Sequence, residues 1–592
     1  MPTDNVTNRT FADLFKGRVQ FVIPFFQRGY AWQRRNWDDL FTDLQDEILK
    51  ELDEGTPLSE VEHFFGPIVI QAKDPGPDEI VEYLVVDGQQ RITTIYLLLG
   101  LIREQIQAKM SYSTQATDYV TELRQVLTNA DGVMGDDYRR LKVFSGKGDR
   151  LPTYAAVFGS EHKPSSPYYA SDVSQYRPGH NLVDDFMKYA RRRLTREFTD
   201  VPNLWRLAQV LLTCLKVVWI PLREGHDDAQ AIFESLNDKG TPLSASELLC
   251  SYLFRPLSKS EGFETLHNEQ WLDAIKVTGG RELFEEYLRH LFSIDERKMI
   301  GKGRKVYVHF KTKNRNLNTG TAREQLARIH ELAPLYQQIT NPSERPHPEL
   351  RIRRLLEEIK HTRMDTPNPF FLACLADLKA GGTTADEVVA MFRETLVLLV
   401  RRKMTEQQAT IYDQMFPILY KKVRFEPDKV RAIQKQFREY GVWTSDQEFS
   451  DAFVRRTLYR SRDLEFTRLV LRELDKAMSP HGQYPDYSTL NSIEHVIPQT
   501  PDVAWKEYLG TEIRDDYFEV IVNSAGNLCL LSQPANSSVG RNAFEAKQNA
   551  YHVASEMTRR IKEHAGPWNL DAVRARSRQL GEMACKIWKW GD

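Results

Sequence analysis

Two short stretches combine residue types that suit chemistry on phosphate groups. The first is Asp87–Arg91, DGQQR, which separates a β-rich run from an apolar run with helical spacing at Ile92, Ile95 and Leu99. Glycine permits a tight turn, and the unpaired backbone N–H groups that open the following helix would face an anion placed there. The pattern predicts a phosphate cradle. A strand-to-helix turn with polar caps has the same composition, so both interpretations stay open.

The second stretch is Ser492–Thr500, SIEHVIPQT, which predicts a short strand that carries Glu494 and His495 and ends at Pro498. Histidine changes protonation near neutral pH, so His495 could take a proton from a water that attacks a phosphodiester. Oxygen ligands from Glu or Asn could hold a divalent ion that offsets the charge of the phosphate. A buried structural pair is the alternative for a lone histidine beside a glutamate.

Residues after this strand complete a recognisable order of elements. A turn at Gly526-Asn527 precedes a strand, Leu528–Leu531, then a polar loop with Asn536 and a helix through Lys547. If Asn536 starts that helix, it lies about three turns before Lys547, so both could face one side and Lys547 could bind phosphate. Strand with histidine, loop, strand and helix form the ββα outline of an HNH, or His-Me finger, nuclease.

Strand-like runs must position the first motif. We expect strands at Val19–Phe26, broken by Pro24, at His63–Ile70 and at Glu82–Val86, and the helix after Asp87–Arg91 then implies a compact α/β unit. Residues 141–181 are rich in Gly, Pro, Ser and Tyr and predict a long irregular insertion.

A second polar pair follows a buried strand predicted at Val217–Leu222. Glu234 and Asn237 are one helical turn apart, just before a helix stop at Gly240. A carboxylate and an amide on one side could hold a metal-bound phosphate or a ribose. A capped helix pair is the alternative, and it is favoured when these residues are taken alone.

From about 257 to 480 the pattern is largely helical, with one helix predicted at Arg323–Leu332 and stopped by Pro334. Basic residues cluster between Arg401 and Arg462, in RRKM, KKVRF and RRTLYRSR. These clusters are a candidate DNA-facing surface, and a solvated helix face is the alternative for each of them.

Composition bounds the function classes. The length predicts two to four domains, and the net charge of −2 neither requires nor excludes a nucleic-acid partner. The five cysteines are scattered without a CxxC pair, which argues against a zinc ribbon and fits a reducing compartment. No apolar run approaches the roughly 20 residues that span a bilayer, so we expect a cytoplasmic protein with no membrane partner. No GxxxxGK[ST] sequence occurs, so any NTPase activity has another source.

Several motifs resemble those of one family. IPFFQRGYAW, FFGPIVI, VVDGQQRITT and IFESLNDKGTPLSASELL are similar to the successive motifs of the ParB/sulfiredoxin-like NTPase domain in GmrSD-type proteins. IEHVIPQ, GNLCLLS, Asn536, Phe544 and Lys547 resemble the HNH domain of the same family. The resemblance implies an α+β multidomain chain: a ParB/sulfiredoxin-like α/β domain at 1–256 with the insertion at about 141–181, a helical middle region at 257–430, and a mainly helical domain with a ββα-metal HNH motif at 431–592.

The resemblance also implies a function. Such a protein, similar to BrxU and SspE, is a type IV, modification-dependent restriction enzyme that hydrolyses a nucleoside triphosphate and nicks or cleaves modified double-stranded phage DNA. Mg²⁺ or Mn²⁺ is expected at the HNH site, the nucleotide is not specified, and a homodimer is expected. The residues carried over to the nucleotide pocket are Gln27, Arg28, Asp87, Gly88, Gln89, Gln90, Arg91, Thr93 and Thr94, with Glu234 and Asn237 lining it. At the nuclease site they are His495 as general base, Asn527 as the residue that orients it, Lys547 as catalytic phosphate ligand, and Glu494 and Asn536 as metal ligands.

Two other classes remain open. A nucleotide-switched regulator would bind DNA without cleaving it, and a toxin nuclease would cut modified and plain DNA alike. The modification itself is not specified, and 5-hydroxymethylcytosine, its glucosylated form, methylcytosine and phosphorothioate are all candidates.

Overall fold

The computed structural model describes residues 6–24, 27–73, 80–109, 115–129, 137–146, 148–159, 181–223, 243–257, 262–408, 410–479, 483–510, 517–551 and 555–591. The chain divides into two units: Met1–His267 with Leu317–Ala322, and Asn268–Asn316 with Arg323–Asp592. Helices and a mixed sheet together confirm the expected α+β class. The three predicted domain ranges remain a prediction.

A mixed sheet lies at the centre of the first unit. Six strands of the described chain form it, in the order β1-β6-β3-β4-β2-β5. β3 pairs parallel with β6 and antiparallel with β4, while β2 pairs parallel with β4 and β5. The four predicted strands of this unit are confirmed. The bounds are β1 (Thr7–Thr10), β2 (Val19–Val22), β3 (His63–Ala72), β4 (Val81–Asp87), β5 (Val143–Phe144) and β6 (Leu215–Leu222).

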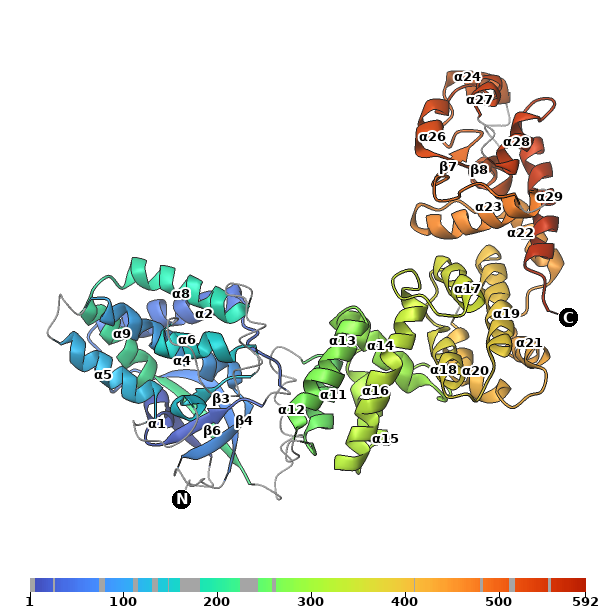
Figure 1. Ribbon diagram of the computed structural model, residues 1–592. Coiled ribbons are helices and arrows are strands. Elements are labelled where there is room, and N and C mark those ends of the chain that lie inside the picture. The colour runs from blue at the N-terminus through green and yellow to red at the C-terminus, as the bar shows by residue number, and fades with distance from the viewer. Residues whose placement is uncertain are drawn as a thin grey trace. The chain divides into compact units, whose positions relative to one another are not determined.

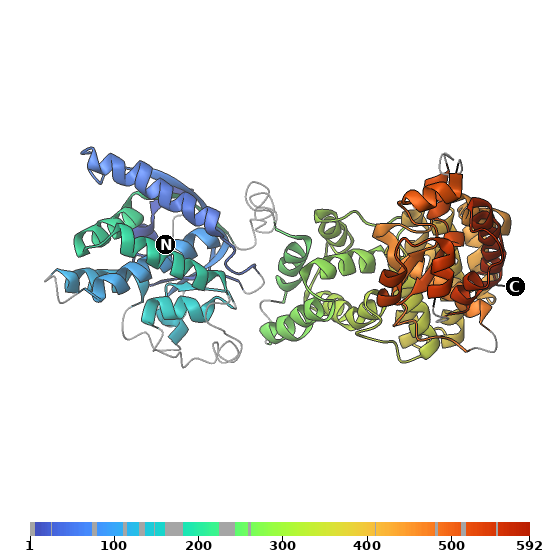
Figure 2. The same ribbon diagram turned by 90° about the horizontal axis from the view of Figure 1, so that it is seen from above.

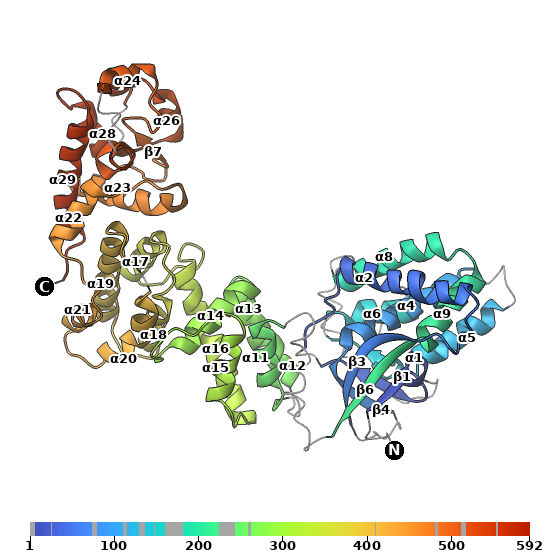
Figure 3. The ribbon, with the colours of Figure 1, turned by 180° about the vertical axis from the view of Figure 1, so that it is seen from behind.

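Helix α4 (Gln89–Gln107) starts directly after β4 and is the central helix of this unit. Every residue from Ile92 to Ile102 is buried, because α4 packs against α5, α6, α8 and α9. Figures 1 and 3 show these helices and α2 gathered over one face of the sheet. The remaining bounds are α1 (Phe11–Leu14), α2 (Arg34–Thr42), the π-helix η1 (Asp43–Leu49), α3 (Lys50–Asp53), α5 (Ala116–Leu127), η3 (Asp137–Arg140), α6 (Arg150–Phe158), α8 (Leu182–Glu197), α9 (Val201–Thr213), α11 (Ala245–Phe254) and α12 (Phe263–Leu266).

Part of the predicted irregular insertion is regular. β5 and α6 both lie within residues 141–181, so the chain returns to the sheet and then forms a helix before residue 160. Residues 160–180 lie outside the described residues.

The second unit is mainly helical, as Figure 2 shows from above. Its bounds as far as α22 are η4 (His267–Leu272), α13 (Asp273–Val277), α14 (Arg281–Ser293), α15 (Arg304–Lys313), α16 (Thr319–Thr340), α17 (Leu350–His361), α18 (Asn368–Lys379), α19 (Ala385–Met404), α20 (Tyr412–Val423), α21 (Lys429–Glu439) and α22 (Asp446–Arg455). Among the described residues, no helix is both long and apolar enough to cross a membrane.

Pro334 does not stop its helix, so that prediction is wrong. α16 continues to Thr340 although proline removes a backbone donor and costs a helix interior about 3 kcal/mol. Ile329, Ala333 and Tyr336 are buried on both sides of the proline. Their burial offsets the local cost, because a continuous apolar face stabilises a helix more than propensity does.

The C-terminal part of this unit carries a two-stranded hairpin, β7 (Ser492–His495) with β8 (Leu528–Leu531). Both strands match the prediction. The predicted polar loop with Asn536 is wrong, because Asn536 lies in the short helix α26. This helix ends before Gly540, whose φ of +50° favours glycine, so Asn536 does not start the helix α27 that carries Lys547. The bounds are η5 (Ser461–Asp463), α23 (Leu464–Met478), α24 (Val503–Leu509), α25 (Phe518–Val522), η8 (Ala525–Asn527), α26 (Gln533–Val539), α27 (Phe544–Ala550), α28 (Glu556–Lys562) and α29 (Leu570–Ile587).

The first basic cluster, RRKM, does not face solvent. Arg401 is fully buried in α19 and donates hydrogen bonds to the Trp588 carbonyl at 2.9 Å, the Thr444 carbonyl at 3.1 Å and the Asp446 carboxylate at 2.6 Å. Its planar guanidinium thereby holds the C-terminal end of the chain against α19. The expectation of a DNA-facing surface is wrong for this arginine.

Candidate functional site

His495 ends β7 and lies opposite Leu528 of β8. Its Nε2 is 3.0 Å from the side-chain oxygen of Asn523. That oxygen also accepts a hydrogen bond of 2.7 Å from Gln499, and the Asn523 amide nitrogen donates to the Glu519 carbonyl at 2.9 Å. The amide orientation is therefore determined by its neighbours. Since its oxygen can only accept, Nε2 of His495 carries the proton and Nδ1 keeps the lone pair.

The environment keeps this imidazole neutral. Burial lowers the pKa of His495 to about 4, with the nearby Lys547 ammonium acting in the same direction and the hydrogen bond to Asn523 opposing both. The ring packs nearly perpendicular to that of Tyr459, with the two ring centroids 4.5 Å apart. At neutral pH His495 therefore has the protonation state of a base, with the accepting nitrogen defined.

Asn527 acts on the backbone next to His495 and does not contact the ring. It is fully buried, and its side chain both accepts from the Ile497 N–H and donates to the Ile497 carbonyl, each at 2.8 Å. A further 2.8 Å bond reaches the Val522 carbonyl. The predicted orienting role of Asn527 stays a prediction, and in this geometry it would act through the main chain.

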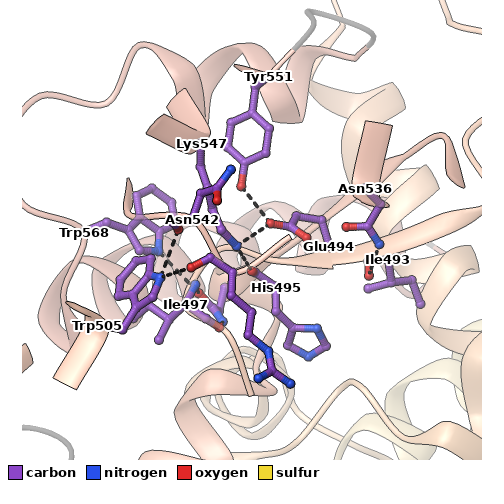
Figure 4. A network of polar contacts seen from close by, with 12 residues as sticks. Ile493, Glu494, His495, Ile497, Trp505, Asn536, Asn542, Lys547, Tyr551 and Trp568 are labelled. Atoms are coloured by element: carbon purple, nitrogen blue, oxygen red, sulfur yellow. Dashed lines mark hydrogen bonds and ion pairs between the residues drawn. The ribbon is translucent and has the colours of Figure 1, made fainter. Parts of the chain in front are cut away.

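Glu494 points to the opposite side of the hairpin from His495, as successive residues of a strand do. Figure 4 shows it directed toward Lys547 and Tyr551. Its carboxylate accepts from the Lys547 ammonium at 2.7 Å and from the Tyr551 hydroxyl at 3.1 Å, and Lys547 also donates to the His495 carbonyl at 2.9 Å. Glu494 and Lys547 are both buried.

These contacts favour a structural pair. Burial raises the pKa of Glu494, and Lys547 opposes that rise. A metal ion at Glu494 would have to replace the ammonium, and a phosphate at Lys547 would need access to a fully buried side chain. Asn536 lies against the same strand, where its amide nitrogen donates to the Ser492 hydroxyl at 2.6 Å. The metal and phosphate roles of these residues remain predictions.

The DGQQR turn depends on Gly88. Its φ is +93°, and a Cβ there would lie 2.9 Å from the Ile68 side chain and 3.0 Å from the Pro67 carbonyl oxygen. Only glycine allows this approach between the start of α4 and β3. The turn therefore positions Asp87 and Arg91 beside β3.

Asp87 and Arg91 form a half-buried charged pair. Burial raises the pKa of Asp87, while Arg91, the Gly88 N–H and Arg28 oppose the rise. Arg91 donates to the Pro67 carbonyl at 3.1 Å and lies 3.8 Å from Asp87. A Cβ on Gly66 would lie 2.7 Å from the Arg91 guanidinium, so Gly66 leaves room for the arginine.

Other predicted residues of this site join the QRGY segment, Gln27–Tyr30, to α4. Gln90 accepts from the Ala31 N–H at 2.7 Å and donates to the Gly29 carbonyl at 3.1 Å. The Thr94 hydroxyl lies 2.8 Å from that of Tyr30. Gln90 and Thr94 therefore hold two distant segments together. Thr93 is buried on the same helix.

Three polar atoms at this site are buried and have no hydrogen-bond partner among the described residues: Gln27 Oε1, Arg28 Nε and Gln89 Oε1. Gln27 uses its amide nitrogen for the Val85 carbonyl at 2.9 Å. Glu234 and Asn237, the other two predicted lining residues, lie outside the described residues.

Two family models match the chain. The model of the GmrSD restriction endonuclease N-terminal domain matches residues 11–254, and that of the GmrSD restriction endonuclease C-terminal domain matches residues 443–583. The chain belongs to the GmrSD restriction endonuclease family. The resemblance inferred from the motifs is thus confirmed at the level of the family. No curated protein matches the chain.

Membership of the GmrSD family gives the coarse function, a nuclease that acts on DNA. The hairpin with His495 lies inside the C-terminal match, and the DGQQR turn lies inside the N-terminal match. Residues 255–442 match neither GmrSD model.

Two residues of these GmrSD domains were missed in the sequence. Asn523 follows a short helix and no motif distinguishes it from an ordinary helix end. Asp149 belongs to the run SGKGD, whose glycines predict an irregular loop. Its carboxylate accepts from the Tyr30 N–H at 2.5 Å, and a Cβ on Gly29 would lie 2.9 Å from it. Burial raises the pKa of Asp149 to about 6, and the Tyr30 N–H opposes the rise.

Metal-binding groupings also occur away from the hairpin. Within the described parts of the chain, three side chains of ligand type come together at Asp43, Glu47 and His63, and again at Glu286, His290 and Asp365. Neither group includes the predicted ligands Glu494 and Asn536.

Proposed function

We propose that this chain is an anti-phage, type IV restriction enzyme that cleaves modified DNA at an HNH-type centre under the control of a nucleoside triphosphate. The observation that carries the proposal is the hydrogen bond from His495 Nε2 to Asn523, 3.0 Å long, inside the segment that matches the GmrSD C-terminal domain. It leaves Nδ1 as the accepting atom of a neutral imidazole.

His495 acts as the general base in this proposal. Its Nδ1 takes a proton from the water that attacks the phosphorus, and Asn523 holds the ring while the positive charge develops. Asn527 keeps the backbone after β7 in place. Mg²⁺ or Mn²⁺ would offset charge on the phosphate oxygens. Glu494 and Asn536 would supply the oxygen ligands that such ions prefer, on condition that the Glu494 carboxylate leaves Lys547 and Tyr551 and turns to the side of β7 on which His495 lies.

The nucleotide occupies the DGQQR site in this proposal. A buried polar atom without a partner costs about 1–3 kcal/mol, and three such atoms gather around this turn. Arg28 and Gln89 offer a donor and an acceptor to phosphate and to base or ribose groups. The first N–H groups of α4 have no partner within the helix and would favour an anion bound beside this turn. The site is assembled without a Walker motif.

Cleavage is tested with purified protein, Mg²⁺ or Mn²⁺, each nucleoside triphosphate, and otherwise identical plain and modified duplexes. We expect scission of modified DNA that needs both metal and nucleotide. His495→Ala should abolish scission and keep nucleotide hydrolysis, whereas His330→Ala, a change at a half-exposed histidine of α16, should leave both intact. Binding without scission would indicate a regulator, and equal cutting of plain DNA would indicate a toxin nuclease.

The nucleotide site is tested separately. Asp87→Asn should abolish nucleotide hydrolysis while the melting temperature stays close to that of the parent. Asp118→Asn, on the exposed side of α5, is the matched control and should hydrolyse at the parental rate. If Asp87→Asn hydrolyses as fast as the control, the assignment of this turn to the phosphates is wrong.

A further inference from the structure

Helix α14 carries a cluster of three side chains of metal-binding type. Glu286 and His290 are one turn apart on α14, and Asp365 comes from the turn before α18. One ring nitrogen of His290 and one carboxylate oxygen from each acid all lie within 4.8 Å of one another. Residues distant in sequence are thus brought within coordinating range of a single ion.

His290 supplies an independent observation that points to a ligand. Its side chain is 1% exposed, and Nδ1 lies 2.8 Å from the Tyr336 hydroxyl. Nε2 is buried and has no hydrogen-bond partner in the part of the chain that the structure describes. Burial lowers the pKa of His290, while the Asp365 and Glu286 carboxylates oppose that shift.

Tyr336 gives this histidine the support that metal-bound imidazoles have. When Nδ1–H donates to the phenolic oxygen, Nε2 holds the lone pair that a cation takes, and the contact fixes the plane of the ring. Asn368 in turn hydrogen-bonds the Tyr336 side chain. The ring orientation is therefore determined by two further residues.

Charge around Glu286 fits an exchangeable cation. The carboxylate lies 2.8 Å from the Lys302 ammonium and 3.0 Å from Arg289. Burial alone would raise its pKa, yet these hydrogen bonds hold the pKa of Glu286 below its usual value, so it is ionised. The Lys302 side chain is 68% exposed. It can turn into solvent when an ion replaces it.

We propose that Glu286, His290 and Asp365 bind a divalent transition-metal ion, with Zn²⁺ as the representative species, at a site separate from the His495 centre. One imidazole nitrogen with two carboxylate oxygens suits Zn²⁺ better than Mg²⁺, which prefers oxygen alone. The ion links α14 to the turn that precedes α18. It gives the helical middle region, which neither family model covers, a metal-dependent stability.

The test is equilibrium dialysis of the full-length chain against Zn²⁺, with metal quantification and with thermal unfolding before and after chelation. We expect binding at this site and a melting temperature that rises with Zn²⁺ but not with Mg²⁺. Glu286→Gln and Asp365→Asn should each weaken binding at least tenfold. Asp365 is exposed, so the Asp365→Asn variant should fold. Weaker binding in this variant therefore reports the loss of a ligand and not the loss of structure.

Two matched variants assign the bound ion. His63→Gln removes the histidine of the other cluster, with Asp43 and Glu47, and should keep the Zn²⁺ that the parent binds here. Lys302→Ala removes the competing ammonium and should bind at least as tightly as the parent. The proposal is overturned if the parent binds no Zn²⁺, if Asp365→Asn binds it with parental affinity, or if binding is lost in His63→Gln or in Lys302→Ala.

Discussion

The Nε2 atom of His495 and the side-chain oxygen of Asn523 are 3.0 Å apart, and this hydrogen bond decides which nitrogen of the ring can accept a proton. Asn523→Ala removes the acceptor and lets the ring turn and change tautomer. We expect the cleavage rate at saturating DNA and metal to fall about tenfold or more, because a positioned base contributes about 10²–10⁴-fold. Unchanged DNA binding in the same variant would show that the loss lies in chemistry. A variant that cuts at the parental rate contradicts the assignment.

The pH dependence of cleavage follows from the lowered pKa of His495. A general base must be unprotonated to accept a proton. The pKa of His495 is about 4, compared with about 6.5 for a free histidine, so the ring stays neutral at pH values where a free histidine is already protonated. The rate should therefore stay level as the pH falls from about 7 to about 5, and decline only near pH 4.

Asn523→Asp provides the comparison. A carboxylate in place of the amide stabilises the imidazolium, so the acid limb of the single-turnover pH profile should move to higher pH. A parental profile that falls with a midpoint near 6.5 would show that His495 is more solvated in solution, or that another group limits the rate.

The buried pair of Glu494 and Lys547 should respond asymmetrically to mutation. Lys547→Met leaves an unpaired carboxylate in the interior, which costs about 3–5 kcal/mol of unfolding free energy. Replacing both residues, as Glu494→Gln with Lys547→Met, should recover much of that loss. Urea unfolding of the single and double variants measures the coupling. If the losses of unfolding free energy in the two single variants simply add up in the double variant, the two side chains do not interact in solution. That result would be expected if Glu494 held a metal ion in place of Lys547.

Gly88→Ala should impair the proposed nucleotide site by more than the backbone strain of an alanine at positive φ explains. Both Gly88 and Gly17 have positive φ, of +93° and +74°, so alanine strains the backbone at either position. A Cβ at Gly17 meets nothing within 4 Å, whereas at Gly88 it lies 2.9 Å from Ile68. We expect Gly17→Ala to cost about 1 kcal/mol and to keep nucleotide hydrolysis. Gly88→Ala should lose hydrolysis, and equal activity in the two variants would contradict the close approach.

The raised pKa of Asp149 should lower the free energy of unfolding as the pH rises. Its pKa is raised to about 6 from a reference near 3.8, so the folded state binds the proton more tightly than the unfolded chain does. Stability from this group is present at low pH and is lost as the pH rises through about 6. Asp149→Asn mimics the neutral form and should gain about 1–3 kcal/mol at pH 7, with a smaller gain near pH 4. Urea unfolding at both pH values checks the sign.

Much of the organisation follows from local pattern. Apolar periodicity and turn residues correctly predict the strand before DGQQR, the helix after it and the strands β7 and β8. These signals act over a few neighbouring residues, so they can be recognised in the sequence. Family membership could be read from the motifs for the same reason. Local signals fail at Pro334 and at Asn536. Tertiary burial carries α16 through the proline, and Asn536 lies in the short helix α26 where its polar neighbours predict a loop.

The motifs of the sequence alone determined that this chain is of the GmrSD type, and local pattern located the DGQQR turn and the strand that carries His495. Only the tertiary structure decided which side chains meet. It placed Asn523 on His495, Asp149 on the QRGY segment, and Lys547 on the buried side of β7 opposite the ring. Such contacts join residues separated by 28 to 119 positions, and they depend on packing that no local pattern encodes.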